Sequence, residues 1–60
     1  MFIKLTDRND DEVYINANAI TYMEKAGNHT YISAVDCSFE VKETPEEIIE
    51  TINIVNTISI

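Results

Sequence analysis

The stretch ETPEE at residues 43–47 separates two hydrophobic patterns and decides the fold. Before it, apolar and polar residues alternate, which is typical of strands with one buried face. After it, apolar residues recur at helical spacing, at Ile48, Ile49, Ile52 and Val55. The stretch itself has the features of a helix start, because Thr44 can cap the first turn, Pro45 suits its first position and Glu47 follows the cap by three residues.

Five short strands are predicted before this junction. They are expected at Phe2–Thr6, Glu12–Ile15, Ile20–Glu24, His29–Ala34 and Phe39–Lys42. Turn-forming residues separate them, namely a polar cluster at 7–11, an asparagine-rich corner at 16–18 and the only glycine, Gly27. The sequence therefore predicts one α+β domain over residues 1–60, an antiparallel meander of about five strands with one C-terminal helix packed on it.

The C-terminal segment carries a mixed signal. Isoleucines also recur there at every second residue, and β-branched residues are mediocre helix formers. We expect the helix to end near Asn56, with Thr57–Ile60 as a candidate short strand. Such a tail would pair with the sheet edge of a neighbouring subunit, or Ile58 and Ile60 would pack on their own core.

The small size of the chain favours an oligomer or a partner protein. A domain of 60 residues buries only about 60% of its unfolded surface, so it is marginal alone. The single cysteine, Cys37, cannot form an internal disulfide, and with the single histidine, His29, it cannot supply the four ligands of a structural zinc site. Self-association or a partner protein is the remaining source of support.

The charge balance narrows the class of partner. Four Lys and Arg stand against 11 Asp and Glu, which gives a net charge of −7. Because such a surface repels phosphate groups, we expect neither nucleic acid nor membrane as a direct partner, and a basic protein surface suits it better. The chain begins without a signal-peptide pattern and has no long apolar run, so a cytoplasmic location is expected.

No catalytic, cofactor or metal site is predicted, and an enzyme is the least favoured class. Asp7, Asn9 and Asp11 have the spacing that opens a calcium loop, but Glu12 stands where that loop needs glycine, so a hairpin turn is the better interpretation. His29 is expected to have a structural role at a strand start. Cys37 is expected to be a small, partly buried side chain.

The sequence offers five candidate interface residues. Tyr14 and Tyr31 are assigned to the surface, while Tyr22 shares the strand face of Ile20 and is assigned to the core. Tyrosine is enriched at interface hot spots, which makes the two surface tyrosines candidates for protein contact. The apolar positions outside the helical stripe complete the set, which comprises Tyr14, Tyr31, Ile54, Ile58 and Ile60.

Short elements along most of residues 2–52 resemble the FlbD family of small bacterial proteins. They are Ile3-x-Leu5-Thr6, YIN at 14–16, I-x-YME at 20–24 and VKETPEEII at 41–49. The resemblance implies a non-enzymatic accessory role in flagellar motility. Members of the family usually carry glycine in the first turn, where this chain has Asn9 and Asp10.

A second stretch, residues 20–32, resembles the opening half of a LytTR DNA-binding domain. That resemblance implies an alternative role as a transcription-linked regulatory module. The present chain ends before the part with which LytTR domains contact DNA, and its net charge is negative. A half-domain of this kind would suit protein contact better than DNA contact.

Overall fold

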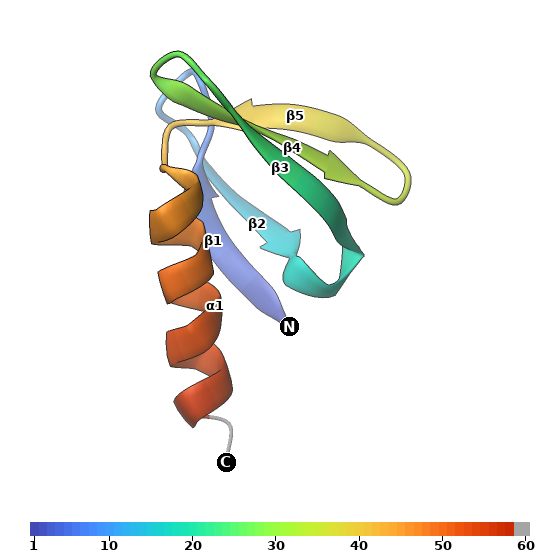
Figure 1. Cartoon of the computed structure of the whole chain (residues 1–60), viewed down its shortest axis with the longest axis vertical. Coiled ribbons are helices and arrows are strands. Elements are labelled where there is room, and N and C mark those ends of the chain that lie inside the picture. Colours follow the sequence, from blue (N-terminus) through green and yellow to red (C-terminus); the bar gives the residue numbers. More distant parts are fainter. Residues whose placement is uncertain (59–60) are drawn as a thin grey trace.

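The computed structural model describes the backbone of residues 1–58 and the side chains of residues 1–55 (Figure 1). The elements follow in the order β1 (Phe2–Thr6), β2 (Glu12–Asn16), the 3₁₀ helix η1 (Ala17–Ala19), β3 (Ile20–Ala26), β4 (His29–Ala34), β5 (Ser38–Val41) and α1 (Pro45–Ile58). This confirms the predicted α+β fold of five antiparallel strands and one C-terminal helix. The predicted strand boundaries are correct for β1 and β4 and differ by one or two residues in the other strands.

The strands form two antiparallel sheets that η1 connects. One sheet pairs β1 with β2, and the other has the order β3-β4-β5. Asn16 caps η1, because its side-chain oxygen accepts the Asn18 N–H at 3.1 Å, so the predicted asparagine corner is confirmed. At the far end, Asp7 and Val41 form an isolated bridge, and the Lys42 N–H donates to the Thr6 carbonyl at 2.8 Å. The two sheets are therefore joined at both ends.

The core lies where the two sheets meet the helix. Its fully buried apolar side chains come from both sheets and from α1, and they are Ile3, Leu5, Ile32, Val41 and Ile48. Helix α1 packs against β1 of one sheet and β3 of the other (Figure 1). The helix therefore holds the two sheets together, since its buried face contacts a strand of each.

The helix begins where the sequence predicts. The Thr44 side-chain oxygen accepts the Glu47 N–H at 3.1 Å, and the Glu47 carboxylate accepts the Thr44 N–H at 2.8 Å. This reciprocal pair is a capping box, and it satisfies backbone donors that the first helical turn leaves without partners. Glu46 and Glu47 also place negative charge in the first turn, where the helix dipole favours it.

The predicted end of the helix is wrong. Helix α1 continues through Thr57 and Ile58, which the sequence assigned to a short strand, while Ile60 lies outside the described residues. Ile52 and Val55 pack against the core at four and seven residues beyond Ile48. These tertiary contacts outweigh the weak helix propensity of β-branched residues, because packing supplies most helical stability in proteins.

The assignment of Tyr22 to the core is also wrong. The register of β3 against β4 shifts between Ile20 and Tyr22, where Ile20 pairs with Ala34 and Tyr22 with Ser33. This bulge reverses the alternation, so that Ile20 and Met23 both pack toward the core and Tyr22 is 54% exposed. A prediction that continues the alternation without the bulge therefore puts every later side chain of the strand on the wrong face of the sheet.

Candidate functional site

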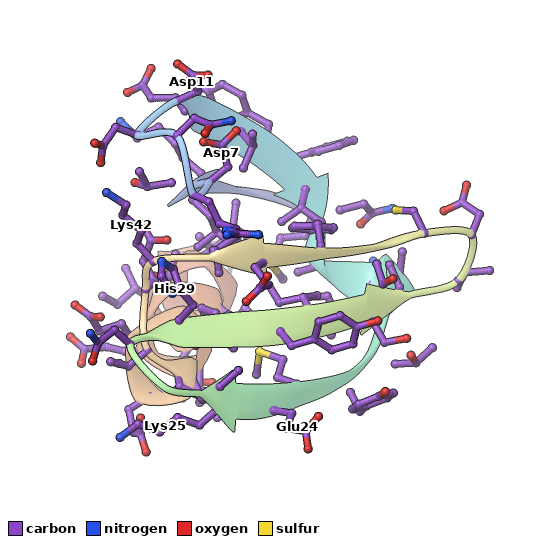
Figure 2. All side chains as sticks on the ribbon, turned by 90° about the horizontal axis from the view of Figure 1, so that it is seen from above. Asp7, Asp11, Glu24, Lys25, His29 and Lys42 are labelled. Atoms are coloured by element: carbon purple, nitrogen blue, oxygen red, sulfur yellow. The ribbon has the colours of Figure 1, made fainter. Side chains whose placement is uncertain are left out.

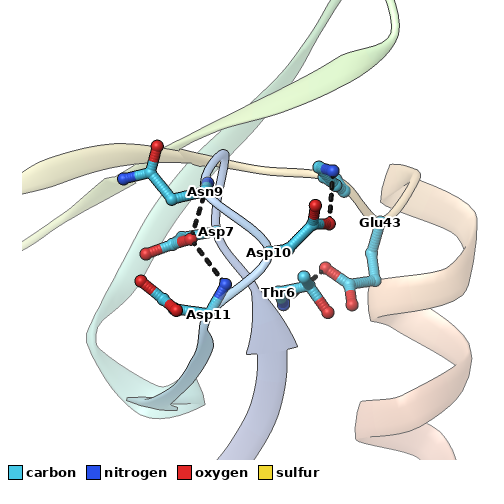
Figure 3. A network of polar contacts seen from close by, with 7 residues as sticks. Thr6, Asp7, Asn9, Asp10, Asp11 and Glu43 are labelled. Carbon is cyan, nitrogen blue, oxygen red and sulfur yellow. Dashed lines mark hydrogen bonds and ion pairs between the residues drawn. The ribbon is translucent and has the colours of Figure 1, made fainter.

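The acidic turn between β1 and β2 is held by its own side chains. One oxygen of the Asp7 carboxylate accepts the N–H groups of Asn9, at 2.8 Å, and Asp11, at 3.0 Å (Figure 3). Asp10 adopts a positive φ of 67°, and its carboxylate pairs with the Lys42 ammonium. The predicted hairpin turn is confirmed. Within residues 1–58, the structure contains no group of three His, Cys, Asp or Glu residues that could hold a metal ion.

Glu43 connects the two sheets at the start of the helix. Its carboxylate accepts the Thr6 N–H at 2.9 Å (Figure 3), as both residues lie at the same end of the first sheet. Its carbonyl accepts the Thr30 hydroxyl at 2.5 Å. Thr30 is fully buried in β4, and Thr6 ends β1. The residue that opens the ETPEE stretch therefore joins one strand of each sheet to the helix, which makes it structural.

A small pocket of about 210 Å³ lies between the β3–β4 turn and the helix start. Its lining includes Lys25 and His29, which Figure 2 shows at the same end of the second sheet. The turn is formed by Gly27 and Asn28, and Gly27 adopts the positive φ, +64°, that the sequence assigns to it. His29 is half-buried as the first residue of β4, the position predicted for it.

A larger groove of about 510 Å³ lies between β2 and the segment from the end of β4 to β5. Most of its lining is apolar, from Val13, Tyr14, Ile15, Ala19, Ala34 and Phe39. Asp7, Asp36, Asn16 and Cys37 complete it, and no lysine, arginine or histidine lines it. Cys37 is exposed in this groove, so the prediction of a partly buried cysteine is wrong.

The sequence does not predict this groove as a unit. Alternation places Val13, Ile15 and Phe39 on inner strand faces, but it does not show that β2 and β5 stand apart. The corner at η1 and the bulge in β3 lie where the first sheet leads into the second. The asparagines at 16 and 18 indicate the corner, and nothing in the sequence indicates the bulge.

The structure does not bring the five candidate interface residues together. Tyr14 is 67% exposed and lines the groove in the first sheet. Tyr31 is half-buried in the second sheet, where its ring centroid lies 6.4 Å from that of Tyr22. Ile54 is 51% exposed on α1. Ile58 is helical, but its side chain and the whole of Ile60 lie outside the described residues.

Three further exposed apolar side chains are absent from the candidate interface residues that the sequence predicts. Phe2 lies diagonally across from Tyr14 on the outer face of the first sheet, since Lys4 pairs with Tyr14 and Phe2 with Asn16. Val35 and Ile49 are the other two. Alternation does indicate Phe2, because it has the strand parity opposite to Ile3 and Leu5.

Ion pairing leaves the acidic excess of the surface in place. Three exposed or half-exposed ion pairs occur among the described residues, and they are Lys4–Glu12, Arg8–Glu40 and Lys42–Asp10. They use three of the four lysine and arginine side chains, while the chain has 11 acidic ones. Eight of the 11 acidic side chains therefore take no part in an ion pair among the described residues. In the part of the chain that the structure describes, no helix is long and apolar enough to cross a membrane.

Comparison with known proteins places this chain in a family. Neither the comparison with curated proteins nor that with solved structures returned a match. A family model, FlbD, described as flagellar and swarming motility proteins, matches residues 2–58. The match begins with β1 and ends with α1, so it spans every element of the fold. The chain therefore belongs to the FlbD family of flagellar and swarming motility proteins.

Proposed function

We propose that this protein is a non-catalytic accessory of flagellar or swarming motility, which acts in the cytoplasm by binding other proteins. The family membership carries the motility part of the proposal. Support for protein binding comes from the exposed apolar side chains, the apolar groove and the uncompensated acidic surface. Large exposed apolar side chains and grooves are features of protein-contact surfaces.

Deletion and complementation in the organism that encodes the protein test the motility role. We expect the deletion strain to swim or swarm more slowly at an unchanged growth rate, and a plasmid copy to restore the rate of expansion on soft agar. An unchanged expansion rate in the deletion strain, under conditions in which the parent strain expresses the protein, would contradict the role.

Self-association is the second part of the proposal. The chain has 60 residues and exposes large apolar side chains on both sheets and on α1, which supports a need for further burial. The negative charge of the chain opposes close approach of two copies, so raising the salt concentration should favour association by screening that repulsion. Light scattering over a series of concentrations and salt levels measures this. A monomer mass throughout would contradict self-association.

The transcription-linked alternative makes a different prediction. Residues 20–32, which resemble part of a LytTR domain, form β3, its turn and the first four residues of β4. The exposed Glu24 lies on this hairpin and points away from the molecule (Figure 2). An acidic surface has few cations with which to neutralise phosphates and so release the counterions of DNA. We therefore expect no salt-dependent binding to duplex DNA. A gel shift that weakens with salt would favour the alternative.

A further inference from the structure

We propose that the groove between β2 and β5 binds an extended segment of a partner protein in which basic and apolar residues alternate. The proposal rests on the proposed function as a protein-binding accessory and names the chemistry of the partner. It draws on three properties of the groove, namely its position between two edge strands, its apolar lining and its lack of basic residues.

The walls of the groove are suited to an extended chain. Among the described residues, β2 is paired only with β1, and β5 is paired only with β4 apart from the bridge at its last residue, Val41, so each strand presents an edge to the groove. At one end of the groove, Asp7 and Val41 form an isolated bridge. At the other end, the Val35 N–H donates to the Ala19 carbonyl at 3.0 Å. Edge strands offer backbone groups to a peptide that adds itself as a further strand.

The lining defines which side chains such a segment needs. Val13, Ile15 and Phe39 are partly buried against the core, and they also line the groove with apolar surface. Because successive side chains of a strand point to opposite faces, every second residue of the bound segment would face this surface. Apolar residues at those positions would bury it.

The charges of the groove favour basic residues at the remaining positions. Asp7 lies at the end near Val41, and Asp36 lies at the end near Ala34, so a carboxylate stands at each end. One oxygen of Asp7 is already bonded to the turn, which leaves exposed Asp36 as the better contact for a cation. The net charge of −7 adds long-range attraction for a basic chain.

A model peptide tests the proposal on the full-length protein. The probe is a fluorescein-labelled peptide of alternating lysine and valine, and the control is the same peptide with glutamate in place of lysine. We expect the lysine peptide to bind, with affinity that falls as salt screens the charges. In two-dimensional amide NMR spectra, the largest shifts should fall on residues 13–19 and 34–39. Addition of the peptide should also slow alkylation of Cys37, the single cysteine, which lies in the groove.

Two double variants separate the groove from general charge attraction. Tyr14→Ala with Asp36→Lys alters the groove at two exposed positions, and Tyr22→Ala with Glu24→Lys makes the same chemical changes on the outer face of the second sheet. Both raise the net charge by the same amount. We expect the first to weaken peptide binding by about tenfold or more, and the second by about twofold at most.

Several outcomes would overturn the proposal. Equal losses in the two variants, equal binding of the glutamate peptide, or amide shifts centred outside the groove would each do so. If the groove variant changes the oligomeric mass while peptide binding persists, the groove is a contact between copies of this chain. Failure of peptide binding would contradict only the groove proposal, because the motility role is tested separately by the deletion strain. A deletion strain with unchanged motility would contradict only the motility role, because peptide binding is measured on the purified protein.

Discussion

Thr30 shows how a single polar side chain fixes the junction between sheet and helix. It is the buried polar residue of the described core, and its hydroxyl donates to the Glu43 carbonyl at 2.5 Å. A buried polar group without a partner is costly, whereas a satisfied one costs little. The hydrogen bond therefore specifies where the chain leaves β5 and turns into α1.

Replacing this hydroxyl should destabilise the fold. We expect Thr30→Val to lower the free energy of unfolding by about 1–3 kcal/mol, because the shape of the side chain is kept while the Glu43 carbonyl loses its donor. Urea denaturation measures the change. The control is Thr21→Val, which removes an exposed hydroxyl bonded to the Ser33 carbonyl at 2.9 Å. Equal losses in the two variants would contradict a special role for Thr30.

Single residues also mark where sequence patterns fail. Gly27 and its turn could be predicted, because glycine is the residue that adopts a positive φ at little cost. Asp10 adopts a similar φ without being glycine. Its pairing with Lys42 helps to hold it there. Tyr22 was assigned to the wrong face, because a bulge depends on pairing with β4 and leaves no local sequence signal.

The helix is the element whose start the sequence specifies best. Capping depends on residues within one turn of each other, so Thr44, Pro45 and Glu47 are sufficient to locate it. Its end depends on contacts with distant strands, which a local pattern does not contain. The prediction was therefore correct at Pro45 and wrong at Thr57.

Removing the cap should weaken the helix and the fold together. We expect Thr44→Ala to cost about 0.5–2 kcal/mol of unfolding free energy, since the Glu47 N–H loses its acceptor. The matched control is Glu46→Ala, an exposed position in the same turn for which the described residues show no capping bond. Thermal or urea unfolding followed by circular dichroism distinguishes the two. A larger loss from Glu46→Ala would show that first-turn charge matters more than the cap.

The buried face of α1 should dominate its contribution to stability. Ile48 is fully buried in the core, while Ile54 on the same helix is 51% exposed. We expect Ile48→Ala to cost about 2–5 kcal/mol, because it removes apolar contacts and leaves a cavity. Ile54→Ala should change the unfolding free energy by less than about 0.5 kcal/mol, since alanine also favours the helix. Comparable losses would mean that α1 does not pack as described.

At the scale of the whole molecule, the groove is a product of how two small sheets meet. Its apolar positions could be predicted one by one as strand faces, and Tyr14 was identified as a surface candidate. The grouping of Tyr14 with Phe39 and Asp36 could not be predicted, because it requires knowledge of where β2 lies relative to β5. Residues from three separate segments form the site, and only long-range pairing brings them together.

The acidic surface is also a property of the whole chain. Its three ion pairs lie at the surface, where such pairs contribute about 0–1 kcal/mol each, so they do little for stability. We propose that the uncompensated carboxylates act instead on association, by attracting basic partners and repelling nucleic acid. Charge and groove thus favour the same class of partner.

Swarming by a complemented deletion strain tests the central claim most directly, namely that the protein serves motility through contact at its groove. The strain carries either the groove variant, Tyr14→Ala with Asp36→Lys, or the matched variant, Tyr22→Ala with Glu24→Lys, each at wild-type abundance and folded by circular dichroism. We expect the matched variant to restore the expansion rate on soft agar and the groove variant to fail. Full restoration by the groove variant would contradict the claim.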